Sequence, residues 1–285
     1  MYSFFSIFAK ALNLKIMNKE FFTMAAGIPI HVSDTQIGNK TLVLLHGYLE
    51  TLSVWDDFML LLDKDIRVIR IDLPGHGMSG TNADINTVDF SAQVVYEALL
   101  KCGVNKCAIV GHSMGGYVAL AFAANYPDAV QGLCLFHSTP NPDPEEKREG
   151  RNREIVLIRE GKLSLAIAKG IPQMFAADNV PRFAEKITEI KEIAEICDPE
   201  GIIACLEGMM ARPDRNTFLA GFTKPLLFVF GEKDRYISME VAQGLAERYK
   251  QAQTLWLANS GHNGFIEEPE KAAEKLNDFM KGLMV

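Results

Sequence analysis

A serine surrounded by glycines stands between two apolar segments near the middle of the chain. The segment 111–116 reads Gly-His-Ser-Met-Gly-Gly; it follows the apolar run 106–110 and precedes a helical pattern over 114–126. This order predicts a strand, a sharp turn and a helix, with Ser113 at the turn. Glycines fit there because a Cβ would clash with the neighbouring strand and helix. The turn is expected to lift the serine hydroxyl clear of the sheet, near a helix amino end that favours negative charge.

Short apolar runs alternate with helical patterns along most of the chain. The expected strands are 28–32, 41–45, 67–71, 106–110, 130–136, 225–230 and 254–257. The expected helices outside the middle of the chain are 53–62, 87–102, 114–126, 238–249 and 269–281. This alternation predicts an α/β fold, in which a mostly parallel central sheet is flanked by helices on both faces.

The interval between Phe136 and Pro225 breaks the alternation. No sheet strand is expected there, whereas 182–197 and 202–211 have the spacing of amphipathic helices. A crossover between parallel strands needs only about a dozen residues, so most of the interval is an insertion. We expect a helical cap over the carboxyl ends of the strands, where open α/β sheets bind their ligands.

The expected domain organisation is therefore one core and one insertion. Residues 19–138 and 219–285 form the core, and residues 139–218 form the cap or lid. Residues 1–18 are too short to span a membrane and lack the features of a signal peptide. This N-terminal extension is expected to be poorly ordered, although a peripheral amphipathic helix or a natural start at Met17 also fits.

The composition indicates which kinds of binding partner and which cellular compartment to expect. The chain has 285 residues, 48% of them hydrophobic, with 29 basic and 36 acidic side chains and a formal charge of -7. No basic run occurs, which disfavours nucleic acid as a partner. The five cysteines form no Cys-x-x-Cys pair, so buried reduced thiols in a reducing cytoplasm are expected. We expect a cytoplasmic monomer or homodimer without a membrane span.

Four further motifs accompany the serine turn. They are His-Gly-Tyr at 46–48, Asp-Leu-Pro-Gly-His-Gly at 72–77, Gly-Glu-Lys-Asp at 231–234 and Gly-His at 261–262. Each motif lies at the carboxyl end of an expected strand or just beyond it. With these motifs in this order, the chain resembles the α/β-hydrolase superfamily, of the capped serine esterase type, from about Ile28 to its end.

The resemblance implies a catalytic triad in the order serine, acid, histidine. Ser113 would be the nucleophile, and His262 in the loop after the last strand would be the base, because an imidazole exchanges protons near neutral pH. Asp234 would hold the imidazole in the correct tautomer. Glu232 is the rival for this role, and Asp143 is a more distant third.

The oxyanion hole is expected to consist of backbone N–H groups. The serine turn places the N–H of Met114, and the resemblance assigns the second donor to Tyr48. His46 and His112 each lie beside a glycine at a strand end, where packing and hydrogen bonding are favoured over catalysis. No His-x-x-x-His or His-Glu-x-x-His spacing occurs, so neither a metal nor a cofactor is expected.

The favoured function is a serine hydrolase that cleaves a carboxylic ester or thioester through an acyl-enzyme on Ser113. Its substrate is expected to be small to medium in size and largely apolar. The candidate substrate-binding residues combine one aromatic residue of the core with soft apolar residues of the cap. They are Tyr48, Met174, Phe175, Met209 and Met210.

Other activities on the same fold stay open. A carbon–carbon bond hydrolase or a lyase of the menaquinone-synthesis type would need basic residues aimed at an anionic substrate. The candidates are Arg148, Arg151, Arg153 and Arg212. A perhydrolase or haloperoxidase-like activity is a further alternative. A receptor-like protein with residual hydrolase activity is another, because function follows the site and not the fold.

Overall fold

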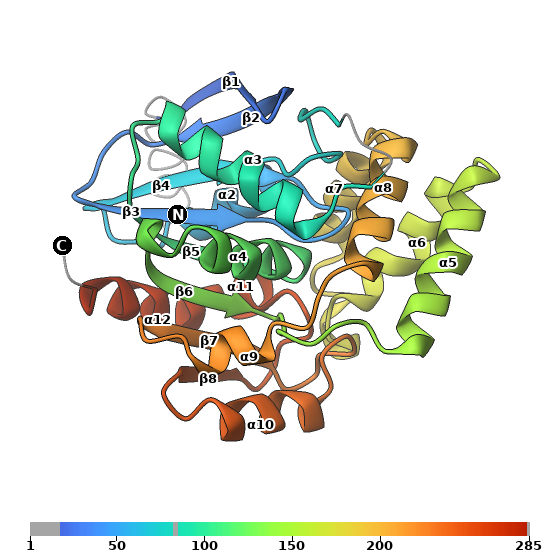
Figure 1. The fold of residues 1–285 in the computed structure, drawn as a ribbon. Helices are drawn as coiled ribbons and strands as arrows, with labels where there is room; N and C mark the ends of the chain where they lie inside the picture. The colour runs from blue at the N-terminus through green and yellow to red at the C-terminus, as the bar shows by residue number, and fades with distance from the viewer. Residues whose placement is uncertain (1–17, 82–84, 284–285) are drawn as a thin grey trace, which may run out of the picture.

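A single eight-stranded mixed sheet forms the centre of the molecule (Figure 1). The computed structural model describes residues 18–81 and 85–283, so the extension expected at 1–18 lies outside the described residues apart from Asn18. The strands lie in the order β1-β2-β4-β3-β5-β6-β7-β8; β1, β2 and β4 pair antiparallel and the remaining neighbours pair in parallel. Their bounds are β1 (Lys19–Ala25), β2 (Ile28–Asp34), β3 (Lys40–Leu45), β4 (Ile66–Ile71), β5 (Cys107–His112), β6 (Val130–Phe136), β7 (Leu226–Gly231) and β8 (Gln253–Leu257).

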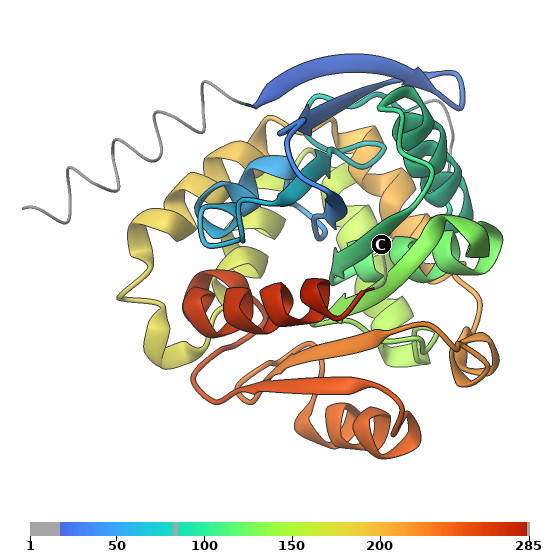
Figure 2. The same ribbon diagram turned by 90° about the vertical axis from the view of Figure 1, so that its left-hand side faces the viewer.

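Helices cover both faces of this sheet (Figure 2). On one face pack α3 (Val88–Lys101), α4 (Met114–Asn125) and α10 (Met239–Arg248); on the other pack η1 (Leu52–Trp55), α2 (Asp56–Met59) and α12 (Pro269–Lys281). Strand β3 shows why: Val43 and Leu45 belong to the first apolar cluster, and Leu42 and Leu44 belong to the second. Successive side chains of a strand point to opposite faces, so a strand buried on both sides is a continuous apolar run. The α/β fold class expected from the sequence is confirmed.

Only helices lie between β6 and β7. Most of them gather at one end of the sheet, at the right in Figure 1, whereas the last one lies near β7. Their bounds are α5 (Glu145–Arg159), α6 (Leu163–Gln173), η3 (Ala177–Asn179), α7 (Ala184–Glu195), α8 (Pro199–Met210) and α9 (Asn216–Ala220). The helix expected at 202–211 starts earlier because Asp198 caps it with its side chain and Pro199 occupies the first helical position.

Two other elements differ from the sequence expectations. The helix expected at 53–62 is shorter, because Thr51 caps the single turn of η1 and α2 ends at Met59. Strand β1 was not expected. It forms a hairpin with β2 through Ala26 and Gly27, whose φ angles of 48° and 83° suit a tight two-residue turn. Several side chains of β1 are exposed at the sheet edge, which weakens the apolar signal that identifies a strand.

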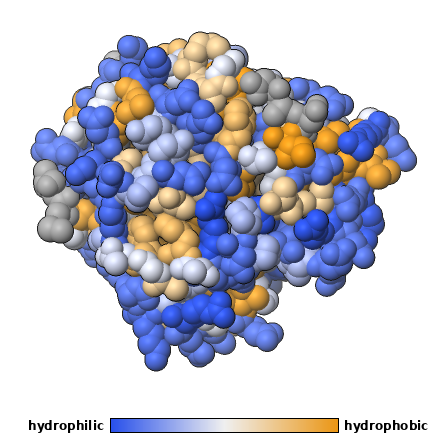
Figure 3. Space-filling view, in the orientation of Figure 1, coloured by the Kyte–Doolittle hydropathy of each residue, from blue (hydrophilic) through white to orange (hydrophobic). Residues whose placement is uncertain are grey.

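The surface is hydrophilic over most of the face drawn in Figure 3. Hydrophobic side chains gather at its right-hand end, where α5 and α6 lie and where Val156 and Leu165 are exposed. Four cysteines are buried, Cys102 is half-buried, and none of the five forms a disulfide. Among residues 18–81 and 85–283, no helix is long and apolar enough to cross a membrane.

Candidate active site

The serine turn joins β5 directly to α4. Ser113 has φ 50° and ψ -113°, a conformation that side chains with a Cβ rarely adopt. A Cβ at Gly111 would lie 2.2 Å from the Gly115 carbonyl oxygen, and one at Gly115 would lie 2.6 Å from the His46 carbonyl oxygen. Both glycines therefore let the turn, the helix and the loop after β3 approach one another. Ser113 stands at the amino end of α4, as expected.

Two loops at the carboxyl ends of β7 and β8 bring Asp234 and His262 together. His262 Nδ1 lies 2.7 Å from Asp234 Oδ2, and the other carboxylate oxygen accepts the backbone N–H groups of Tyr236 and Ile237 at 2.7 and 3.1 Å. These bonds assign the proton of the neutral ring to Nδ1. Nε2 is then free to accept a proton. The backbone N–H of His262 donates to the Met174 carbonyl at 2.7 Å, so the helical insertion also positions this loop.

The two rival carboxylates lie elsewhere. The Glu232 side chain is exposed. Asp143 instead contacts Arg151 Nε at 2.7 Å and Arg212 Nη1 at 2.8 Å. Of the three acids considered in the sequence analysis, Asp234 is therefore the one that contacts His262.

Burial and charge shift both members of the Asp234–His262 pair. Burial alone would raise the pKa of the Asp234 carboxyl, but the charge of His262 and hydrogen bonds from His137 and His262 hold that pKa well below its usual value. Burial lowers the pKa of His262, and the Asp234 carboxylate only partly opposes this. Near neutral pH the pair therefore consists of a carboxylate and a neutral imidazole, the state that a general base needs.

Ser113 and His262 line the same cavity. Its volume is ≈ 610 Å³, and its walls include Tyr48, Met174 and Met209. Among the described residues, Ser113 Oγ has no hydrogen-bond partner. Hydrogen bonds between a nucleophile and its base often tighten only when substrate binds.

Phe175 and Met210 do not line this cavity, unlike the other three candidate substrate-binding residues. Phe175 is fully buried and packs against Phe183, with ring centroids 5.8 Å apart. Met210 is buried in the core cluster. Consecutive residues of a helix point about 100° apart, so Met209 faces the cavity and Met210 turns away from it.

The expected oxyanion donors have no competing acceptor. Within the described ranges, neither the Tyr48 N–H nor the Met114 N–H donates to another group. Met114 is the first residue of α4, where backbone N–H groups have no partner inside the helix. The Tyr48 hydroxyl donates to Glu154 Oε1 at 3.0 Å, which holds the ring against the insertion.

Comparison with known proteins identifies the fold. A family model described as "alpha/beta hydrolase fold" matches residues 40–154. A solved thermophilic esterase from Thermogutta terrifontis with malate bound superimposes with a TM-score of 0.85 and 27% identity, covering 93% of this chain and 98% of that one. This chain has the α/β-hydrolase fold.

The similar sequences include esterases. A pimeloyl-[acyl-carrier protein] methyl ester esterase from Yersinia pseudotuberculosis is 26% identical over 247 residues, which is 85% of this chain and 93% of the relative. The same kind of esterase from Vibrio vulnificus is 27% identical over 250 residues, 86% of this chain and 96% of the relative. An enol-lactonase from Burkholderia xenovorans shares the fold, with a TM-score of 0.84 and 22% identity, and covers 92% of this chain and 100% of that one.

A third histidine joins this site. His137 Nδ1 lies 3.1 Å from Asp234 Oδ2, the oxygen that His262 also contacts, and His137 Nε2 accepts the Gly264 N–H at 3.1 Å. Burial lowers the pKa of His137 to about 4, so its ring is neutral and donates from Nδ1. The sequence analysis missed this residue. Its position directly after β6, at the carboxyl edge of the sheet, was the available signal.

The same three side chains have the composition of a metal site. The ligand atoms of His137, Asp234 and His262 lie within 4.8 Å of one another. However, both Nδ1 atoms donate to one Asp234 oxygen, so their lone pairs are not available to a metal in this arrangement. The group fits a hydrogen-bonded network better than a ligand set, and the expectation of no metal stays a prediction.

A buried ion pair connects the serine turn, the loop after β3 and the loop of His262. Glu50 Oε2 lies 2.8 Å from His112 Nδ1 and accepts the Gly47 N–H at 2.6 Å. His112 Nε2 lies 2.8 Å from the His262 carbonyl oxygen. Both ring nitrogens of His112 thus face acceptors, which suits an imidazolium with two N–H donors.

Glu50 and His112 each oppose the effect of burial on the pKa of the other. Burial would lower the pKa of His112, but the Glu50 carboxylate raises it above its usual value. Burial would likewise raise the pKa of Glu50, and His112 lowers it instead. The charge of His112 in turn helps to lower the pKa of His262. The sequence analysis assigned His112 to hydrogen bonding but did not identify Glu50, since no local motif links residues 62 positions apart.

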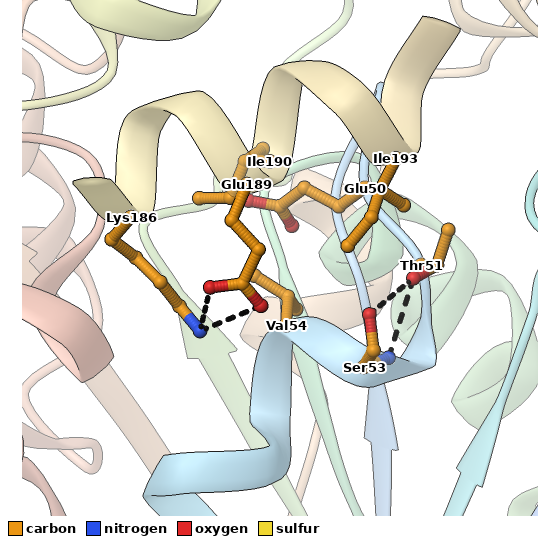
Figure 4. Close-up of a pocket in the computed structure, with 8 residues that line it drawn as sticks. All are labelled: Glu50, Thr51, Ser53, Val54, Lys186, Glu189, Ile190 and Ile193. Atoms are coloured by element: carbon orange, nitrogen blue, oxygen red, sulfur yellow. Dashed lines mark hydrogen bonds and ion pairs between the residues drawn. The ribbon is translucent and has the colours of Figure 1, made fainter. Parts of the chain in front are cut away.

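Glu50 also borders a second, much smaller cavity under helix α7 (Figure 4). Lys186 and Glu189 of α7 close it with an ion pair of 3.0 Å. Its volume of ≈ 10 Å³ is close to the space that one water molecule needs, about 10–15 Å³. It is too small for an ester. The cavity beside Ser113 is the candidate substrate site because both Ser113 and His262 line it.

Proposed function

We propose that the protein is a serine hydrolase that cleaves a carboxylic ester or thioester through an acyl-enzyme on Ser113. The observation that carries the proposal is the contact of 2.7 Å between His262 Nδ1 and Asp234 Oδ2, which leaves Nε2 free in the cavity that Ser113 also lines. The similarity to esterases of comparable length supports the same reaction class.

The proposed reaction has two halves. Ser113 Oγ attacks the carbonyl carbon while His262 Nε2 takes its proton, and the N–H groups of Tyr48 and Met114 stabilise the oxyanion. The tetrahedral intermediate then expels the alcohol or thiol, which receives that proton from His262. In the second half, His262 removes a proton from water as the water oxygen attacks the acyl carbon. The tetrahedral intermediate then expels Ser113 Oγ, which takes that proton back from His262, and the carboxylic acid leaves.

The helical insertion is proposed as a cap over this site, with residues 139–218 as its bounds. Side chains from α5, α6 and α8 line the cavity together with Ser113 and His262. The volume of ≈ 610 Å³ falls in the range of small-molecule sites, about 300–1,000 Å³. The apolar part of the wall would receive an acyl chain of small to medium length. It consists of Leu49, Ile171, Met174, Met209 and Ile237.

Hydrolysis of p-nitrophenyl acetate by purified variants tests the proposal. Ser113→Ala and His262→Ala are each expected to lower kcat by at least about 10³-fold, because triad members act as a unit. Ser164→Ala is the matched control, since this serine is exposed on α6 and lies outside the cavity. Turnover that survives in Ser113→Ala would contradict the proposal. Turnover absent from the unmutated protein would favour a receptor-like or carbon–carbon bond-cleaving role.

A further inference from the structure

Helix α5 lines the cavity beside Ser113 with charged side chains. Lys147, Arg151 and Glu154 are spaced by four and three residues, so they share one face of the helix, and all three border the cavity. The whole chain has a formal charge of -7, which makes cations facing the substrate site notable.

Arg151 is held in place but keeps most of its donors unused. Its Nε donates to Asp143 Oδ2 at 2.7 Å, and its side chain is only 12% exposed. A guanidinium has five N–H donors. Among the residues that the structure describes, the η nitrogens of Arg151 have no hydrogen-bond partner. These nitrogens are also not sealed off from solvent. A buried carboxylate thus holds Arg151 at the cavity wall while its η nitrogens have no partner among the described residues.

Tyr117 and Lys147 stand beside this guanidinium. Tyr117 lies one helical turn after Ser113 and borders the cavity, and within the described part of the chain its hydroxyl forms no hydrogen bond. Burial would raise the pKa of Tyr117, but Lys147, Arg212 and Arg151 together lower it below its usual value. Lys147 forms no ion pair with any described residue. The potential around the Tyr117 hydroxyl is therefore positive.

The nearby acids do not cancel these charges. Asp143 is shared between Arg151 and Arg212, and Arg212 also lies 3.9 Å from the centre of the Tyr117 ring. Glu154 accepts a hydrogen bond from the Tyr48 hydroxyl, and burial raises the pKa of its carboxyl. Glu146, the other acid on the cavity wall, is exposed to solvent. The cavity wall thus carries four basic side chains, Lys147, Arg151, Arg153 and Arg235, against the two acids Glu146 and Glu154.

We propose that Arg151, Lys147 and Tyr117 bind a carboxylate on the substrate, so that the ester or thioester cleaved at Ser113 belongs to a small acid carrying a second, ionised carboxyl group. This inference rests on the proposed hydrolase function. Arginine binds carboxylates through two parallel hydrogen bonds, which the free η nitrogens provide. The methylene chain between the two carboxyl groups would pack against the apolar wall at Met174 and Met209.

Two matched esters test the inference. The ratio of kcat/KM for 4-nitrophenyl hydrogen adipate to that for 4-nitrophenyl hexanoate measures the preference for the carboxylate. Arg151→Met is expected to lower this ratio about 10- to 100-fold, since charged hydrogen bonds are lost. Arg151→Lys keeps the positive charge but loses the planar pair of donors, so its ratio should lie between those of the unmutated protein and Arg151→Met. Arg148→Met is the control, because this exposed neighbour does not line the cavity. An unchanged ratio in Arg151→Met would overturn the inference.

Direct binding separates this inference from the hydrolase proposal. Adipate is expected to bind the Ser113→Ala protein in titration calorimetry, and Lys147→Met and Arg151→Lys should weaken that binding. If neither ester is hydrolysed but adipate binds through Arg151, the subsite stands and the proposed function fails. If both esters are hydrolysed at Ser113 while adipate does not bind, the subsite fails and the proposed function stands. Binding of inorganic phosphate in place of adipate would also overturn the carboxylate assignment.

Discussion

At the scale of single residues, the Asp234 carboxylate is contacted by four hydrogen-bonding groups. Two backbone N–H groups satisfy Oδ1, and two imidazole rings, those of His137 and His262, approach Oδ2. Such a carboxylate keeps its charge although it is buried. It thereby fixes the proton of His262 on Nδ1, which is the tautomer that the proposed chemistry requires.

Asp234→Asn tests this assignment. The amide would present an N–H to His262 Nδ1 and favour the wrong tautomer, so kcat is expected to fall about 10⁴-fold with a smaller change in KM. Glu232→Gln, two residues away and exposed, should stay within about two-fold of the unmutated protein. Steady-state kinetics of both variants on one ester measure these changes in kcat and KM. A larger loss in Glu232→Gln would show that the acid is misassigned.

The pH dependence of kcat/KM tests the Glu50–His112 pair. His262 acts as a base only when unprotonated, so the rate should rise with pH through its pKa, which lies below the usual value of about 6.5. Glu50→Gln removes the partner that keeps His112 charged. With less positive charge beside His262, its pKa should rise, and the acid limb should move to higher pH. Glu189→Gln is the control, and an acid limb that stays in place in Glu50→Gln would count against the pair.

Sequence motifs mark some of these residues and not others. Ser113, Asp234 and His262 each follow a recognisable strand within a short motif, and the structure brings Asp234 and His262 into contact. His137 and Glu50 carry no such motif. Their partners lie 97 and 62 residues away, so only the folded chain shows the pairing.

At the scale of elements, the strand–turn–helix unit around Ser113 depends on backbone contacts too close for a side chain. Gly115→Ala would place a Cβ 2.6 Å from the carbonyl oxygens of Leu45 and His46. We expect this variant to lose about 1–3 kcal/mol in the free energy of unfolding. The loop that carries the Tyr48 N–H would shift with them, so activity should fall as well.

Gly244→Ala is the matched control for that prediction. A Cβ at this position in α10 meets nothing within 4 Å. Alanine is the better helix former, so a gain of about 0.5–1 kcal/mol is expected. Urea unfolding of both variants measures the difference. Equal stability of the two would mean that the close approach at Gly115 is not needed.

Element prediction succeeded where the apolar pattern was strong. The buried parallel strands and the amphipathic helices α7 and α8 were found from periodicity. Helix α5 was not singled out, because its sequence is dominated by charged residues and only Ile155 and Ile158 are buried. Several of these charged residues line the substrate cavity. The helix with the weakest sequence signal therefore carries the side chains proposed to determine substrate preference.

At the scale of the whole molecule, the insertion and the core are joined at the loop of the base. Besides the contact from His262 N–H to Met174, the buried Glu267 carboxylate accepts the N–H groups of Ala176 at 2.8 Å and Gly261 at 2.6 Å. The insertion therefore helps to position His262 as well as to line the cavity. The sequence predicted the insertion from its excess length, but not this connection, which depends on how the two parts pack.

Covalent labelling with a fluorophosphonate tests whether Ser113 is an activated nucleophile. Such reagents form a stable adduct with a serine that a neighbouring base activates. Peptide mass analysis is predicted to find the adduct on Ser113, with labelling much slower in His262→Ala and absent at that position in Ser113→Ala. An adduct on another residue, or ester turnover that continues after Ser113 is fully labelled, would contradict the account.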